Sequence, residues 1–204
     1  RHSWGLPKGF ADFLIRLRVN GCPQYCCMVA TCGDDCGLAA RQWREVMEAK
    51  GLTADAAYSV QMPNTYVIFP GFDVDKPEVE QRKLSAAPQA ADALCRRIEA
   101  MEKGDFTHHG SVAWLKSRII YPLFMRHVND RPFATTDACV GCGRCAAACP
   151  TANITISSHK PQWHGDCLNC LACYHACPHH AVTFGRRTHG KGRYTCPDNK
   201  STSK

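Results

Sequence analysis

Apolar and polar positions alternate with two different periods along the first half of the chain. Residues 10–17 place Phe and Leu at i, i+3, i+4 and i+7, which predicts one face of a helix. Residues 25–30 are continuously apolar, which is typical of a parallel strand buried on both faces. A second helical stripe covers residues 39–47. Alternating apolar positions over residues 58–62, continuing to residue 69, predict a second extended segment.

A third helix is expected after the second extended segment. Residues 75–78 resemble a capping box, and Pro88 is expected to kink or restart the helix that they open. The resulting α–β–α–β–α order predicts an α/β fold, an open parallel sheet with helices on its faces. Two strands are too few for a stable sheet. We therefore expect a truncated domain, or one whose missing edge is covered by a partner.

Residues 110–130 are expected to connect this part to the rest of the chain. Apolar residues from Val112 to Phe124 follow helical spacing, with Pro122 interrupting them. An amphipathic helix of this kind suits a membrane surface. Packing on the α/β domain is the simpler interpretation, and we favour it.

Composition is ordinary in all but one respect. Hydrophobic residues make up 45% and charged residues 21%, which excludes a fibre, a coiled coil and a disordered chain. No apolar run reaches the roughly 18 residues that a membrane span needs. The exception is cysteine, at 15 of 204 residues. The odd count and the chain length argue against a pure disulfide scaffold.

Most of these cysteines belong to a duplicated motif. Residues 139–150 follow the pattern C-x2-C-x2-C-x3-C-P, and residues 167–178 repeat it. The match extends beyond the motif, since residues 154–156 correspond to residues 182–184. A repeat of this quality predicts two copies of one structural unit related by a pseudo-twofold axis.

The spacing is that of bacterial ferredoxins, in which the fourth cysteine of each motif ligates the other cluster. Three cysteines at i, i+3 and i+6 bring three thiolates to three corners of one cluster. Zinc also binds four cysteines, but its sites rarely carry a third cysteine at the same step and a closing Cys-Pro, both duplicated. We therefore expect two [4Fe–4S] clusters. The expected ligands are Cys139, Cys142, Cys145 and Cys177 for one cluster and Cys167, Cys170, Cys173 and Cys149 for the other.

The remaining features change this interpretation little. The formal charge of +7 would fall to about +3 with two clusters, and no basic stripe with interleaved aromatic residues suggests nucleic acid. A third metal site is an alternative for five crowded cysteines near the N-terminus, although buried thiols are the default. These five are Cys22, Cys26, Cys27, Cys32 and Cys36.

The chain as a whole resembles flavodoxin-like domains fused to a C-terminal two-cluster bacterial ferredoxin. The ferredoxin resemblance covers residues 133–188, and the flavodoxin-like one covers residues 3–105 through Trp4-Gly5-Leu6-Pro7, residues 30–35 and residues 59–66. The family's first three strands and its phosphate-binding loop are missing from this sequence. The resemblance implies that an FMN ring would lie beside Trp4, Thr31, Cys32 and Gly33. Without the phosphate loop, this chain alone is expected to bind FMN poorly, unlike a full-length relative.

These observations predict an electron carrier rather than a catalyst in its own right. The expected order is a partial flavodoxin-like domain (1–109), a helical connector (110–132), an α+β ferredoxin domain with two [4Fe–4S] clusters (133–188) and a flexible tail (189–204). Single electrons would pass to or from a redox partner protein or a flavin, in a reducing cytoplasm. The alternative is an FMN-dependent oxidoreductase that uses the clusters as an internal electron wire.

Overall fold

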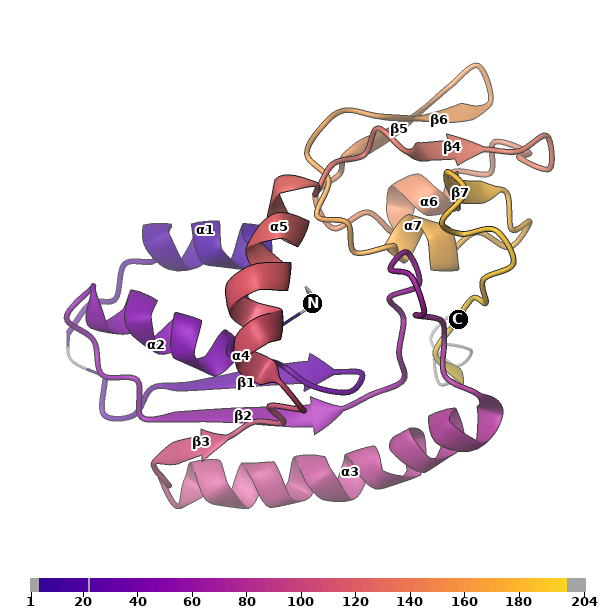
Figure 1. Ribbon diagram of the computed structural model, residues 1–204. Coiled ribbons are helices and arrows are strands. Elements are labelled where there is room, and N and C mark those ends of the chain that lie inside the picture. The colour runs from indigo at the N-terminus through magenta and orange to yellow at the C-terminus, as the bar shows by residue number, and fades with distance from the viewer. Residues whose placement is uncertain (1–3, 22, 198–204) are drawn as a thin grey trace, which may run out of the picture. The chain divides into compact units, whose positions relative to one another are not determined.

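The computed structural model describes residues 4–21 and 23–197 (Figure 1). The chain forms two compact units. The first comprises the residues up to Pro63 together with Lys76–His127, and the second comprises Asn64–Asp75 together with the residues from Val128 onward. Residues 64–75 therefore group with the second unit, although the sequence suggested that they belong to the first domain.

The first unit is built on a three-stranded parallel sheet in the order β1-β2-β3. Its strands are β1 (Cys27–Cys32), β2 (Ala56–Gln61) and β3 (Gly104–Phe106). The helices α1 (Lys8–Arg16) and α2 (Ala39–Glu48) lie on one side of this sheet, and α3 (Pro77–Glu99) lies on the other (Figure 1). The layered α/β architecture is the one that the sequence predicts.

Three local features of the first unit differ from the sequence expectation. The sheet contains β3, which is only three residues long and too short to show a period. The edge strand β1 is not buried on both faces, since the side chain of Val29 is 52% exposed. The helix α3 continues through Pro88 without a restart. A proline removes one backbone hydrogen-bond donor from a helix. The other backbone hydrogen bonds of this 23-residue helix keep it continuous through Pro88.

The connector is a continuous helical segment that packs on the first unit. It consists of α4 (Ala113–Leu115), the π-helix η1 (Lys116–Ile120) and α5 (Tyr121–Arg126). Ser117 Oγ donates to the carbonyl oxygen of Trp4 at 2.7 Å, and the Lys116 ammonium lies 2.8 Å from the Asp35 carboxylate. Pro122 does not break the segment; it lies in the first turn of α5, directly after the π-helix, and a first turn tolerates a missing N–H.

The second unit contains two short antiparallel sheets and two one-turn helices. The first copy of the repeat supplies β4 (Phe133–Thr135), α6 (Arg144–Ala147) and β5 (Ile154–Ser157). The second copy supplies β6 (Lys160–Trp163), α7 (Ala172–His175) and β7 (Val182–Phe184). β4 pairs with β7 and β5 pairs with β6, so each sheet takes one strand from each copy. The sequence repeat is thus a structural repeat whose halves are interleaved.

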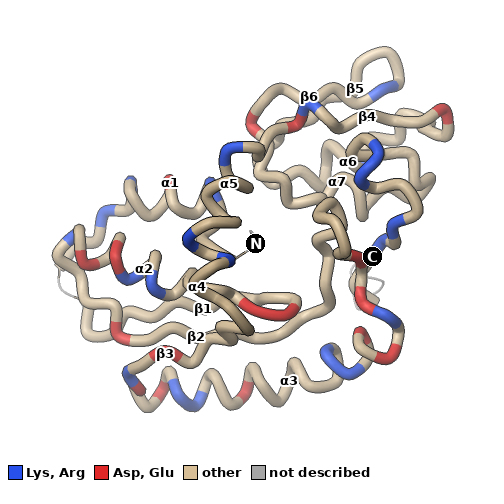
Figure 2. The backbone as a smooth tube through the Cα atoms, in the orientation of Figure 1, with Lys and Arg blue, Asp and Glu red and all other residues tan. Residues whose placement is uncertain are grey.

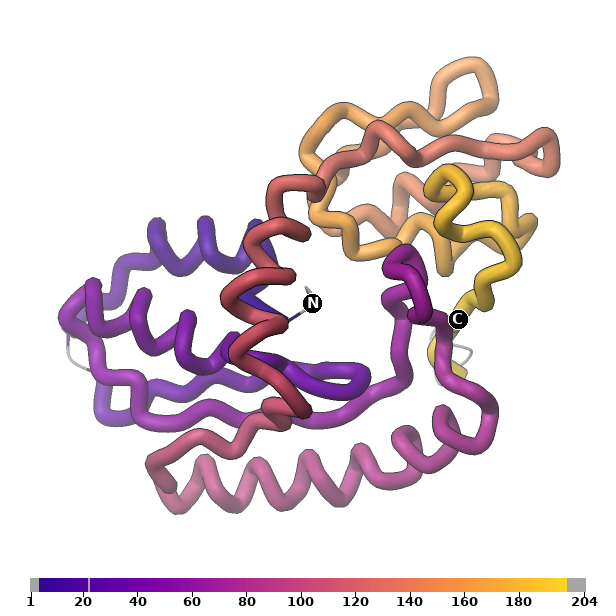
Figure 3. The backbone as a smooth tube through the Cα atoms, viewed as in Figure 1, coloured from indigo at the N-terminus to yellow at the C-terminus, as the bar shows by residue number. Residues whose placement is uncertain are grey.

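The loop 64–75 contributes to the core of the second unit. Val67 and Ile68 are buried among its hydrophobic residues, which include Phe133, Tyr174 and Val182. The sequence suggested that the second strand continues to residue 69, but β2 ends at Gln61 and an irregular loop follows. Figure 3 traces this loop beside the C-terminal part of the second unit, where Lys191 Nζ donates to the carbonyl oxygen of Phe72 at 2.7 Å.

Residues 189–197 pack on the second unit, in contrast to the flexible tail that their composition suggested. Tyr174 Oη donates to the carbonyl oxygen of Lys191 at 3.0 Å, and the Arg193 guanidinium lies 3.8 Å from the centre of the Tyr174 ring. These contacts involve single residues without a periodic pattern, so the sequence gives no sign of them. Residues 198–204 of the expected tail lie outside the described residues. Among those that the structure describes, no helix is long and apolar enough to cross a membrane.

Candidate metal centre

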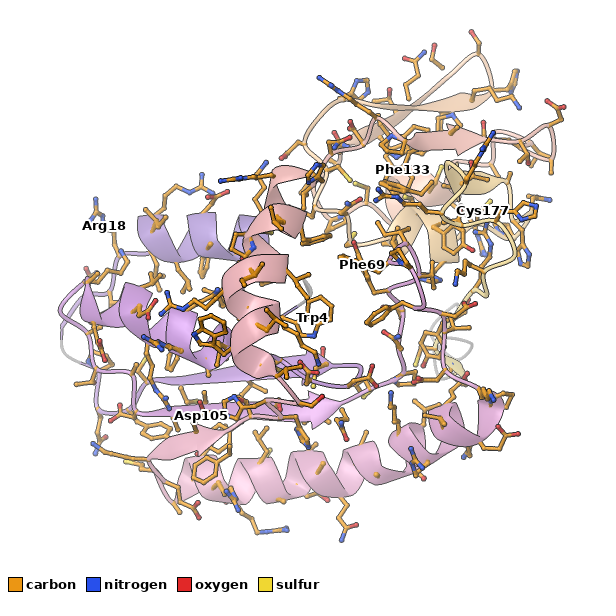
Figure 4. The ribbon with its side chains drawn as sticks, viewed as in Figure 1. Trp4, Arg18, Phe69, Asp105, Phe133 and Cys177 are labelled. Carbon is orange, nitrogen blue, oxygen red and sulfur yellow. The ribbon has the colours of Figure 1, made fainter. Side chains whose placement is uncertain are left out.

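The eight cysteines of the duplicated motif line two small cavities in the second unit. One cavity is lined by Cys139, Cys142, Cys145 and Cys177, called here the first quartet. The other is lined by Cys149, Cys167, Cys170 and Cys173, called here the second quartet. Each cavity therefore brings together three cysteines of one motif and the last cysteine of the other, which is the grouping expected from the sequence. Figure 4 labels Cys177 on the loop that follows α7.

Left-handed backbone residues shape the two cysteine loops in the same way. Gly141 and Asn169 occupy equivalent positions with φ of 70° and 55°, and Gly143 and Leu171 do so with φ of 77° and 61°. A Cβ atom on Gly141 would lie 2.8 Å from the carbonyl oxygen of His159, so glycine is needed there. Left-handed turns of this kind direct successive N–H groups into a concavity that suits an anion.

Backbone N–H groups already point at cysteine sulfur atoms. The N–H of Asn169 donates to Cys167 Sγ at 3.2 Å, and the N–H of Ala181 donates to Cys177 Sγ at 3.3 Å. Hydrogen bonds to sulfur are one of the means by which a protein tunes an iron–sulfur cluster.

Burial makes several of these thiols weak acids. It raises the pKa of Cys173 to about 12 and that of Cys167 to about 11, and neighbouring cysteines add to both shifts. It also raises the pKa of Cys145. Thiolates that converge in a buried cavity repel one another and need a compensating positive charge. Bound iron would supply this charge, and the charge would favour deprotonation of the coordinating thiols.

Cys177 behaves differently from these thiols. Burial works to raise its pKa, but the N–H groups of Val182, Ala181 and His179 outweigh burial and lower it. The positive charge of Arg193 acts in the same direction. The first quartet thus includes a sulfur atom that the surrounding chain already favours as a thiolate.

Two buried polar atoms without a protein partner among the described residues belong to Trp163, in the lining of the second cavity, and to Asn169, on the loop between Cys167 and Cys170. Within the described chain, Asn169 Oδ1 and Trp163 Nε1 have no hydrogen-bond partner, and Asn169 is only 2% exposed. The Trp163 indole stacks on Phe133, with the ring centres 5.5 Å apart, and lines the cavity together with Cys173. A bound cluster with its sulfur acceptors would give such a donor a partner, so these residues fit the group.

A single metal ion fits less well. Across residues 4–21 and 23–197, no three His, Cys, Asp or Glu side chains converge as they would around one ion. A tetrahedral zinc ion with Zn–S bonds of about 2.3 Å holds its sulfur atoms about 3.8 Å apart. Side chains gathered as closely as one zinc ion requires are not found among the described residues.

The residues expected beside FMN are only partly brought together. Thr31 and Cys32 line a cavity of about 220 Å³ in the first unit, next to Leu6 and Phe10. Trp4 and Gly33 do not line it, and the carbonyl oxygen of Trp4 is bonded to the connector by Ser117.

This cavity does not fit FMN. It is smaller than the roughly 300 Å³ at which pockets for drug-sized ligands begin. Its lining includes no Lys or Arg for a phosphate, and its one carboxylate, Asp35, is paired with Lys116.

The cysteines outside the quartets do not converge into a third metal site within the described residues. Cys32 and Cys36 are buried, and Cys26 and Cys27 are half-buried at the start of β1. Cys22 lies outside the described residues. Cys95 was expected in the core because it borders an apolar stripe, but it is exposed on α3, since the stripe residues Leu94 and Ile98 are themselves only half-buried.

Sequence reasoning missed three residues around the quartets: Asp130, Trp163 and Arg193. Each reaches its quartet through long-range contacts, and none belongs to the repeated motif. Charged residues of both signs are spread over both units (Figure 2), so charge alone does not single out Asp130 or Arg193.

Comparison with known proteins identifies the family of one segment. Residues 138–182 match the family model of the 4Fe-4S dicluster domain. No curated protein and no solved structure matches the chain. The match spans the duplicated motif and less than half of the chain. The chain thus contains a ferredoxin-type iron–sulfur domain, and the match supports at least one [4Fe–4S] cluster.

Proposed function

We propose that this protein carries single electrons through two [4Fe–4S] clusters, one bound by the first quartet and one by the second. The observation that carries the proposal is the pair of cavities, each lined by four cysteines that come from both copies of the repeat. When bound, the clusters supply the one-electron chemistry. The chain supplies ligands, hydrogen bonds and shielding from water.

Apolar side chains complete each cavity. Ile156, Pro161 and Val182 line the first cavity beside the cysteines. Phe133, Trp163 and Leu171 line the second. These side chains reduce the access of water to the sulfur atoms, more fully at the second quartet than at the first, where Cys142 is exposed. Solvent exposure is one of the quantities that set a cluster's reduction potential.

The small size of the secondary structure in the second unit also favours bound clusters. Its strands have three or four residues each, and its two helices have four. Such short elements bury little apolar surface, and small domains of this kind usually need a metal or a disulfide to fold. The cysteines of both quartets are free thiols, so iron is the available cross-link.

For the first unit we propose a partial flavodoxin-like domain, supported by its parallel sheet with helices on both faces. Its role would be to present the ferredoxin-type unit to a redox partner protein or a flavoprotein. We place the protein in a reducing compartment such as the cytoplasm, because clusters assemble on free thiolates. The FMN-dependent oxidoreductase alternative gains no support from the cavity near Thr31.

The proposal is tested by anaerobic purification with assays for iron, acid-labile sulfide and flavin. Electron paramagnetic resonance of the dithionite-reduced protein follows. Two four-iron clusters predict about eight iron and eight sulfide per chain. A colourless protein with stoichiometric zinc and no paramagnetic signal would overturn it. Bound FMN with substrate-dependent turnover would favour the oxidoreductase.

A further inference from the structure

We infer that the two quartets hold clusters of unequal reduction potential, the first quartet the higher, and that Arg193 and Asp130 are the residues that separate them. This inference rests on the proposed two-cluster function. Both are positioning residues outside the cysteine motifs; Arg193 acts chiefly on the first quartet and Asp130 on the second.

The contacts of Arg193 fix its guanidinium around the Cys177 loop. Its Nη2 donates to the carbonyl oxygens of His180 at 2.9 Å and Val182 at 2.7 Å, and its Nη1 donates to that of Tyr174. Tyr174 lies before Cys177 in the chain and the other two follow it. The guanidinium interacts favourably with the Cys177 thiol and, less strongly, with the thiol of Cys173 in the second quartet. A permanent positive charge is therefore held beside one ligand of the first quartet.

Asp130 places the opposite charge beside the second quartet. Its side chain is buried, and its Oδ2 accepts from Asn153 Nδ2 at 2.9 Å and from the N–H of Gly165 at 2.6 Å. Asn153 lines the cavity of the second quartet. Gly165 lies two residues before Cys167, a ligand of that quartet, so Asp130 is held beside this ligand.

The linings of the two cavities differ in the same sense. Arg144 and His179 line the first cavity, whereas the described lining of the second contains no basic residue. The first quartet is also the more accessible, since Cys142 is exposed and the neighbouring Val140 is 58% exposed. No member of the second quartet is exposed.

Reduction adds one negative charge to a cluster, so these differences have a predictable sign. A nearby cation and access to water favour the reduced state, whereas a nearby anion and burial disfavour it. Every observed difference therefore raises the potential at the first quartet relative to the second. In the singly reduced protein, the electron is expected at the first quartet, beside the exposed Cys142.

A redox titration of the anaerobic full-length chain, followed by electron paramagnetic resonance, tests the inference. Two one-electron steps are expected. Arg193→Gln should lower the reduction potential of the higher step by ~59 mV, which corresponds to a tenfold change in the ratio of reduced to oxidised cluster. Asp130→Asn should raise the reduction potential of the lower step by a similar amount. Arg186→Gln, which removes the same charge from an exposed position of the same unit, should move neither step by a comparable amount.

The outcomes separate the inference from the function on which it rests. Absence of clusters in the unmodified chain overturns the function. If two clusters are present but neither variant shifts a reduction potential, or both variants shift the same step, the inference is overturned and the proposed function stands. If Arg193→Gln loses iron, Arg193→Lys keeps the charge and should retain the higher step. If Arg193→Lys also loses iron, the test rests on Asp130→Asn. An unchanged reduction potential of the lower step in that variant refutes the inference.

Discussion

Cys139 and Cys177 line one cavity, although they belong to different copies of the repeat. The same exchange governs the strands, since β4 of the first copy pairs with β7 of the second. Neither copy can complete a quartet or a sheet without the other. The second unit is therefore one interleaved structure rather than two ferredoxin-like halves in series, and its folding is expected to depend on bound metal.

Removal of iron is expected to unfold the second unit while the first stays folded. The short strands and helices around the quartets have little core of their own, whereas the sheet of the first unit packs around Trp43 and Met47. Limited proteolysis with and without an iron chelator checks this. Cleavage should appear within residues 133–188 only after chelation. A protease-resistant iron-free segment there would contradict it.

Ile68→Ala is expected to destabilise the ferredoxin-type unit. Ile68 is 3% exposed in the core of that unit, and loss of a buried Ile side chain costs about 2–5 kcal/mol. The measurement is the urea midpoint for loss of visible cluster absorbance. Ile15→Ala is the matched control, because Ile15 is exposed on α1 of the first unit and should leave the midpoint unchanged. Equal midpoints for the two variants would show that residues 64–75 do not stabilise this unit.

Gly141→Ala is expected to impair the first quartet more than a comparable glycine change elsewhere. The added Cβ would lie 2.8 Å from the carbonyl oxygen of His159, in a backbone with φ of 70°. Gly165 also has a positive φ, but a Cβ added there would meet nothing within 4 Å, so Gly165→Ala carries the backbone strain without the clash. Iron per chain after anaerobic purification should fall for Gly141→Ala and stay closer to normal for Gly165→Ala. A reversed order would contradict the account.

Stability of the first unit is expected to fall in acid through Asp55. Hydrogen bonding to Lys103 and to the N–H of Cys26 lowers the pKa of Asp55, against a smaller opposing effect of burial. Because the folded pKa is below the unfolded value of about 3.9, the stabilisation is present above that value and is lost as the pH falls through the folded pKa. Asp55→Asn should be less stable at pH 7 and lose part of the acid dependence, as measured by circular dichroism across about pH 2–7. An unchanged acid transition would show that Asp55 does not contribute to it.

The spacing of the eight cysteines predicts which four share a cavity, because cluster chemistry constrains it; their role as ligands stays a prediction. The long helices and the two longer strands of the first unit also follow from periodic patterns. Other features lie beyond such patterns. β3 is too short to show a period, and the burial of Val67 and Ile68 in the second unit depends on long-range packing. Arg193 sits in a Gly- and Lys-containing stretch that resembles a solvated tail, and only its contacts with the Cys177 loop distinguish it.

The iron content of Cys177→Ser tests the interleaved quartets most directly. The full-length chain should contain about eight iron atoms, and Cys196→Ser, a change outside the motifs, should keep them. Cys177→Ser should lose iron from the site of Cys139, Cys142 and Cys145, leaving about four atoms at the second quartet. A variant that instead keeps all eight atoms, or that loses the cluster of Cys167, Cys170 and Cys173 while the other remains, would contradict the account.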